Sequence, residues 1–107
     1  MAWEQEKKEK YTIFKPIVTN AQDFEKDILS LNTAENKIID TRSVSLSETA
    51  IAHFSKLFNQ HANDHLSFII VVPSLDEMTR LEDYFVAVPT ISEAIDYIYM
   101  EELERNL

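Results

Sequence analysis

Two histidines near the middle of the chain have a spacing that could hold a metal ion. His61 and His65 are four residues apart, so on a helix both imidazole rings would project from one face, as in helical zinc sites. Asp64 is the one residue of another ligand type beside them in sequence. The competing interpretation places both rings in the last turn of a helix, where imidazolium is favoured by the negative end of the helix dipole. We prefer the second interpretation and predict no metal site.

Most other catalytic chemistry lacks the residues that it needs. The sequence contains no cysteine, which excludes thiolate nucleophiles and cysteine-bound metals. It also contains no glycine, and phosphate-binding loops need glycine so that the backbone can approach the anion. The hydroxyls, histidines and carboxylates show neither the arrangement of a catalytic triad nor that of an acid pair. We therefore predict no enzyme activity and no cofactor.

Three hydroxyl side chains crowd the start of a predicted helix. Ser45 and Glu48 have the spacing of a capping box, and Ser47 and Thr49 stand beside them. One interpretation is plain N-capping, which contributes on the order of 1 kcal/mol. The other is a regulated or partner-facing surface, because a phosphate here would meet unpaired N–H groups and the positive end of the helix dipole. The predicted partner surface comprises Ser45, Ser47, Glu48, Thr49 and Ala50.

The charge of the chain limits its partners. With 10 basic and 19 acidic residues the formal net charge is −9, which repels nucleic-acid phosphates and anionic lipids and favours a basic or neutral protein. Residues 1–10 lack the apolar core of a signal peptide, and the longest apolar run, residues 68–72, is too short for a membrane span. We therefore expect a cytoplasmic protein that binds neither nucleic acid nor membrane.

Short runs rich in β-branched and aromatic side chains predict the strands of a sheet. Such runs occupy residues 11–18, 37–41, 67–72 and 85–88. Pro16 removes a ladder donor from the first run, so this strand is expected at an edge of the sheet. A short partner strand around Trp3 is a weaker prediction.

Apolar side chains at steps of three and four residues predict helices between and after these strands. The helices are expected at residues 20–31, 45–61, 75–81 and 90–107. Thr19 or Asn20 is expected to cap the first helix, and Thr90 with Glu93 forms a capping box for the last. Because glycine is absent, asparagine is the residue best able to take the left-handed conformation at helix ends and turns. The candidates are Asn32, Asn36, Asn59 and Asn63.

The alternation of strands and helices predicts an α/β fold. A chain of 107 residues has room for one domain, residues 1–107, with a charged segment at 1–10 and an acidic helix end at 100–107. Alternation implies right-handed crossovers and a mostly parallel or mixed sheet of four or five strands flanked by helices. Ile70 and Val71 should then point to opposite faces of a central strand, both nearly fully buried.

Three segments carry a resemblance to a known family. Asp40 follows a buried strand, Ser47-Glu48-Thr49-Ala50-Ile51 opens the next helix, and Val88-Pro89-Thr90-Ile91-Ser92-Glu93-Ala94 joins the last strand to the last helix. At these places the chain resembles STAS domains, the fold of bacterial anti-sigma factor antagonists. The resemblance implies a STAS-like fold, a non-catalytic regulatory function, and an anti-sigma-type kinase or other regulatory protein as partner. It places the family's phosphoacceptor nearest Thr49, but the family's Ser-Gly pair is missing, so we expect constitutive binding.

The end of the chain, residues 99–105, is also similar to short bacterial STAS-like proteins sometimes labelled ribonuclease Z. That activity requires a metal-binding H-x-H-x-D-H motif. Here Asp64 and His65 match it, whereas Gln60 and Ala62 stand in the positions of the other two histidines. A metallohydrolase is therefore the least favoured interpretation.

An apolar row continues toward the C-terminus at every fourth residue. Tyr99, Leu103 and Leu107 extend the row beyond the length that a compact domain needs, and negative charges surround them. The row either forms an association surface, for a homodimer or another partner, or packs on its own domain. The acidic character also favours an alternative function, that of a small inhibitor or immunity-type protein that blocks a basic enzyme.

Overall fold

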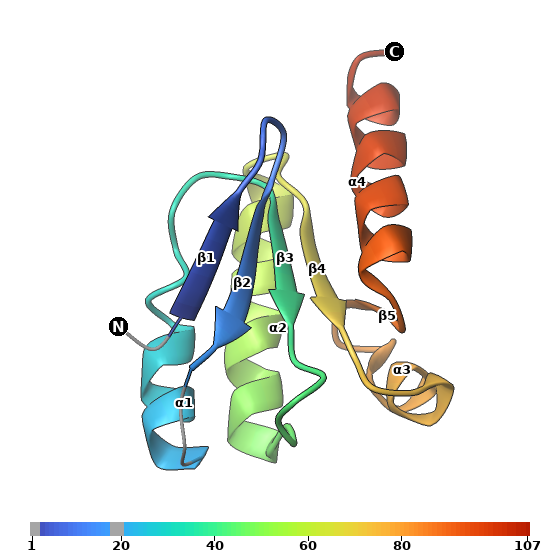
Figure 1. Cartoon of the computed structure of the whole chain (residues 1–107). Coiled ribbons are helices and arrows are strands. Elements are labelled where there is room, and N and C mark those ends of the chain that lie inside the picture. Colours follow the sequence, from blue (N-terminus) through green and yellow to red (C-terminus); the bar gives the residue numbers. More distant parts are fainter. Residues whose placement is uncertain (1–2, 18–20) are drawn as a thin grey trace.

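The computed structural model describes the backbone of residues 3–17 and 21–107 and has the expected α/β architecture (Figure 1). A five-stranded mixed sheet has the order β1-β2-β3-β4-β5. The strands are β1 Trp3–Lys7, β2 Thr12–Pro16, β3 Lys37–Asp40, β4 Phe68–Val71 and β5 Val86–Val88. The helices are α1 Ala21–Ile28, α2 Glu48–Asn63, α3 Leu75–Leu81 and α4 Ile91–Arg105. The expected cap at Thr19 or Asn20 lies outside the described residues.

The pairing of the strands corrects the predicted position of Pro16. The four strands from β2 to β5 are parallel, and β1 pairs antiparallel with β2, so β2 is an inner strand and the predicted edge position is wrong. Pro16 is tolerated because it is the last residue of β2, opposite Trp3. The Trp3 ring packs against Phe24 of α1 at 5.6 Å, and its Nε1 donates to the Asp27 carbonyl at 3.1 Å. These contacts hold β1 in place, so that β1 and not β2 forms the edge of the sheet.

Hydrophobic cores lie on both faces of the sheet, as the buried runs predict. Ile70 points into the core formed with α1, α2 and α3, whereas Val71 points into the core formed with α4, and both are fully buried. Ala94 and Ile98 of α4 cover the second face. The prediction for Ile70 and Val71 is therefore confirmed.

Side-chain caps fix where the helices begin. The Thr90 hydroxyl accepts from the Glu93 N–H at 3.1 Å, as predicted for α4. The predicted cap at Ser45 is wrong, because Ser47 is the N-cap of α2 and accepts from the Ala50 N–H at 3.1 Å. The Leu46 side chain is buried in the core and the backbone of Ser47 is extended, so the first helical turn begins only at Glu48.

The end of α2 uses a histidine where an asparagine was expected. His65 has a φ of 61°, and it is the one non-glycine residue with positive φ in the part of the chain that the structure describes. The Leu66 N–H donates to the His61 carbonyl at 2.8 Å and the His65 N–H to the Ala62 carbonyl at 3.1 Å, which is a Schellman motif. Asn36 instead has a buried structural role, since its Oδ1 accepts from the Ser67 N–H at 2.8 Å.

Candidate functional site

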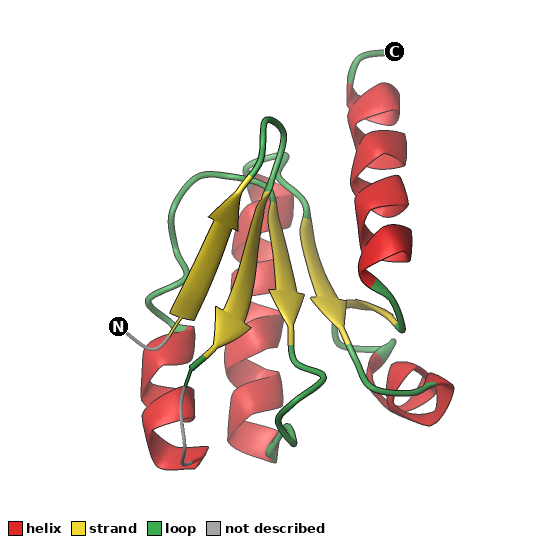
Figure 2. Ribbon diagram, in the orientation of Figure 1, coloured by secondary structure: helices red, strands yellow, loops and turns green. Residues whose placement is uncertain are grey.

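Most of the predicted partner surface lies at the sheet end where the parallel strands terminate. Figure 2 shows the loop from β3 to α2 at the end to which the arrowheads of β2, β3 and β4 point. Ser45, Ser47, Glu48 and Thr49 are exposed there, whereas Ala50 is buried in the core. A partner on this surface would therefore contact the first four residues and not Ala50, so the prediction is wrong for Ala50.

Carboxylates surround the hydroxyl groups at the start of α2. The Ser47 hydroxyl, besides capping the helix, donates to Oε1 of Glu25 on α1. Glu48 is the first residue of α2 and precedes Thr49. A phosphate on Thr49 would lie at the positive end of the helix dipole but among these acidic groups, so attraction and repulsion compete.

An ion pair that the sequence analysis did not identify lies at the same end of β3. Asp40 is buried, and the Arg42 guanidinium donates to both of its carboxylate oxygens at 2.9 Å. These hydrogen bonds hold the pKa of Asp40 below its usual value, against the opposing effect of burial. The pair borders a hollow of about 520 Å³ with Lys15 and Ile91 also in its wall. The sequence signal that could have identified the pair is Asp40-Thr41-Arg42, an Asp-x-Arg sequence that begins at the last residue of a buried strand.

His61 and His65 do not form a common site. His61 is buried, and its Nδ1 faces the Leu57 carbonyl at 2.7 Å, so Nδ1 carries the proton and Nε2 is free to accept. Lys37 Nζ donates to that Nε2 at 2.7 Å. His65 is exposed in the turn after α2. Among residues 3–17 and 21–107, no group of three or more potential ligands could hold a metal ion.

The expectation of a charged imidazole at the end of α2 is wrong for His61. Burial lowers the pKa of His61 below its ordinary value of 6.5, and the hydrogen bond to the Leu57 carbonyl opposes this only in part. The positive charge at this place belongs to Lys37, which is fully buried at the start of β3 and also donates to the Thr33 carbonyl. Burial lowers the pKa of Lys37 to about 8, with Glu35 opposing the shift.

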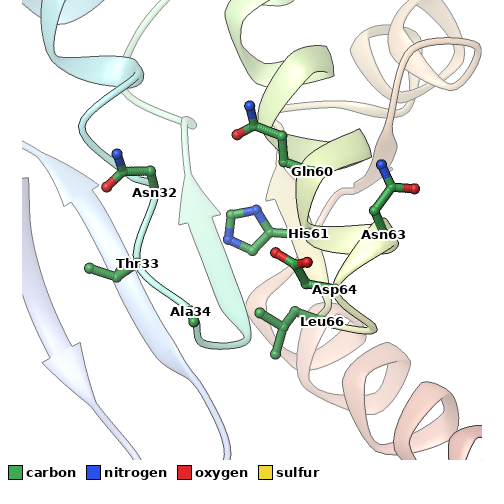
Figure 3. A pocket seen from close by; sticks show the side chains of 8 residues that line it. All are labelled: Asn32, Thr33, Ala34, Gln60, His61, Asn63, Asp64 and Leu66. Atoms are coloured by element: carbon green, nitrogen blue, oxygen red, sulfur yellow. The ribbon is translucent and has the colours of Figure 1, made fainter.

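A polar hollow of about 260 Å³ opens above this buried pair. Figure 3 shows His61 between the loop of residues 32–34 and the end of α2, where Gln60, Asn63 and Asp64 also line the hollow. Both ring nitrogens of His61 already have partners, so the ring offers no free group to a ligand. The pair is therefore best understood as a structural feature of the core.

The buried pair predicts how stability depends on pH. Because the folded protein resists protonation of His61 while the unfolded chain takes up a proton near pH 6.5, the free energy of unfolding should fall as the pH drops below about 6.5. It should rise between about pH 8 and pH 10.5, where Lys37 is neutral only in the folded state. Urea denaturation across this range measures both trends. A Lys37→Met/His61→Leu variant that keeps both trends would contradict this origin.

The predicted association row is exposed, but its last member, Leu107, lies beyond the end of α4 at Arg105 and does not continue the helical spacing. Tyr99, Leu103 and Leu107 all have accessible side chains, and so does Met100, which the sequence analysis did not include. The structure thus shows this row uncovered by the described part of its own domain. It lies on a different helix from the hydroxyl groups at the start of α2.

Comparison with known proteins gives the fold and no family. No protein-family model matches the chain, and no curated protein matches it. The chain is similar to a solved structure described as "NMR Structure of the protein TM1081", with a TM-score of 0.64, 18% sequence identity and coverage of 89% of this chain and 86% of that chain. This likeness supports the α/β fold over nearly the whole length. None of the described helices is both long and apolar enough to cross a membrane.

Proposed function

We propose that this protein is a non-catalytic, regulatory protein-binding module of the cytoplasm, comparable in function to STAS anti-sigma factor antagonists. The observation that carries the proposal is the exposed polar surface of Ser45, Ser47, Glu48 and Thr49 at the start of α2. Helix starts offer unpaired N–H groups, and loops at the ends of sheets are common binding positions. The expected partner is an anti-sigma-type kinase or another regulatory protein.

The chemistry around these hydroxyl groups favours binding over catalysis. Ser47 is engaged as a helix cap and as a donor to the Glu25 carboxylate, and among the described residues no histidine ring contacts its hydroxyl. His61 lies thirteen residues further along α2, about 20 Å from the start of the helix at 1.5 Å per residue, and its ring nitrogens are occupied. The hydroxyl groups at the start of α2 and the His61 imidazole are therefore not brought together as a nucleophile and its base.

The acidic surroundings favour constitutive binding over a phosphate switch. A phosphate on Thr49 adds about −1.5 to −2 charges. Glu48 and Glu25 are already at this surface, and the helix dipole contributes at most about 2 kcal/mol of attraction. We therefore expect phosphorylation of Thr49 to be weak or absent.

Thr49→Asp should lower affinity for the partner at least tenfold, about 1.4 kcal/mol, because it places a new charge in the interface. The partner is first captured from native extract with the wild-type protein and identified by mass spectrometry, and its affinity is then measured by calorimetry. Ser92→Asp is the matched control, since Ser92 is the second residue of α4 as Thr49 is of α2, and both are exposed. Both substitutions should leave the thermal midpoint nearly unchanged. Equal affinity of the wild type and Thr49→Asp would remove this surface from the proposal.

A second candidate function is inhibition of a basic enzyme, favoured by the net charge of −9 and the carboxylates along α4. The identity of the captured protein separates the two functions. A kinase of the anti-sigma type supports the first, and a basic nuclease or toxin supports the second.

A further inference from the structure

Hydrogen bonds attach one side of the second half of α4 to the rest of the domain. Glu102 accepts from Asn36 Nδ2 at 2.9 Å and from Lys10 Nζ at 3.2 Å, and Arg105 donates to the Ser67 hydroxyl at 2.7 Å. One turn earlier, Ile98 is fully buried against the sheet. Figure 1 shows α4 continuing past the turn between β1 and β2. The helix is thus anchored through its last turn, with one side turned away from the sheet.

The outward side carries large apolar side chains. Tyr99, Met100 and Leu103 lie at helical spacing and are 45%, 59% and 69% exposed; we call these three residues the α4 stripe. Leu107 is also fully exposed, but it lies two residues beyond the end of α4 and is not part of the stripe. A helix that served only to cover the sheet would carry polar residues on this side, and contiguous exposed apolar groups mark binding surfaces.

Negative charge borders the α4 stripe. Glu93, Asp96 and Glu104 are exposed and have no ion-pair partner among the described residues. The pKa of Tyr97 is raised, first by burial and then by the carboxylates of Glu101 and Glu104, as expected in a negative field. Two copies of this surface would bring like charges together, whereas a partner with basic flanks would neutralise them.

We infer that the α4 stripe is a docking surface for a basic amphipathic helix of another protein, which buries its apolar face on Tyr99, Met100 and Leu103 and places Lys or Arg against the flanking carboxylates. An amphipathic helix suits the site because apolar residues at i, i+3 and i+4 on one helix pack along the same spacing on another. The α4 stripe lies on a different helix from the surface at the start of α2. The experiment on one surface can therefore contradict its proposal without contradicting the other.

The test uses a defined probe and the intact chain. A fluorescein-labelled helical peptide of leucine and lysine, with leucine at the apolar heptad positions, is titrated with the protein in an anisotropy assay. A peptide of the same pattern with glutamate in place of lysine serves as the charge control. We expect binding of the lysine peptide that weakens at least tenfold between 50 and 300 mM salt, and at least tenfold weaker binding of the glutamate peptide.

Matched variants assign the binding to the α4 stripe. Leu103→Gln should weaken binding of the lysine peptide at least tenfold, whereas Leu75→Gln on α3 should leave it unchanged, although Leu75 is 64% exposed and so matches Leu103. Circular dichroism melts confirm that both variants are folded. Equal loss in the two variants, or equal affinity for the two peptides, would overturn the inference. A concentration-dependent dimer in sedimentation that Leu103→Gln abolishes would also overturn it, because the occupant would then be a second copy of the chain.

Discussion

Phe54→Ala should lower the free energy of unfolding by about 3 to 5 kcal/mol, the largest effect expected from a single core truncation here. Phe54 is fully buried on α2 and packs against three aromatic rings from other parts of the fold. Its ring centroid is 6.1 Å from that of Phe24 on α1, 6.2 Å from that of Phe68 on β4 and 6.2 Å from that of Phe85 before β5. Truncation therefore leaves a cavity at the place where α1, α2 and the sheet meet.

Urea denaturation followed through the fluorescence of Trp3, the one tryptophan of the chain, measures this effect, since Trp3 is buried in the same core. Phe58→Ala, one turn further along α2 and only partly buried, is the control and should cost less than about 2 kcal/mol. If Phe54→Ala does not fold, Phe54→Leu should still show a loss of about 1 to 2 kcal/mol. Equal losses for Phe54→Ala and Phe58→Ala would show that the ring cluster is not the centre of the core.

His61→Leu should destabilise the protein by about 3 to 5 kcal/mol at pH 7, because it removes a hydrogen-bond acceptor from a buried ammonium group. Lys37 Nζ would keep the Thr33 carbonyl as a partner but lose the imidazole at 2.7 Å. The loss should shrink above about pH 8, where Lys37 can become neutral in the folded state. Denaturation at pH 7 and pH 9.5 measures the difference.

Replacing both partners separates charge from shape. Lys37→Met/His61→Leu should be within about 1 kcal/mol of the wild type, or more stable, since a buried polar pair can be replaced by apolar groups of similar size. His53→Leu, on the same helix with one weak ring contact to the Glu25 carbonyl at 3.3 Å, should change stability by less than about 1 kcal/mol. A double variant as unstable as His61→Leu would mean that the shape of the imidazole, and not the charge of Lys37, is what the core requires.

The amino-acid sequence by itself determined the order of the elements and the two-sided burial of the sheet. Both features follow from local patterns, because the period of apolar residues distinguishes helices from strands and a continuous β-branched run such as 68–72 has no polar face to expose. The Thr90 cap was predicted for the same reason, since the hydroxyl and the N–H that it binds are three residues apart. The hydroxyl-rich start of α2 was also visible as a cluster in sequence.

Only the tertiary structure decided the features that depend on distant residues. Pro16 lies in an inner strand because Trp3 packs on α1 and thereby places β1 beside β2. Helix α2 begins after Ser47 because the side chain of Leu46 is buried in the core. The pairing of Lys37 with His61 joins residues 24 positions apart, and no local pattern indicates that a lysine will be buried. His65 takes the left-handed conformation because the hydrogen bonds from the His65 and Leu66 N–H groups to the last turn of α2 offset its modest local cost.

The α4 stripe shows both contributions. The spacing of its apolar residues can be recognised in the sequence. Whether such a row packs on its own domain or faces outward depends on which side of the helix is anchored. The orientation of α4 is set by hydrogen bonds on the side opposite the stripe. Glu102 binds Asn36 and Lys10 there, and Arg105 binds Ser67. These hydrogen bonds span between 38 and 92 residues of sequence. Long-range polar contacts of this kind have no periodic signal, which is why only the folded chain reveals which face of α4 remains open.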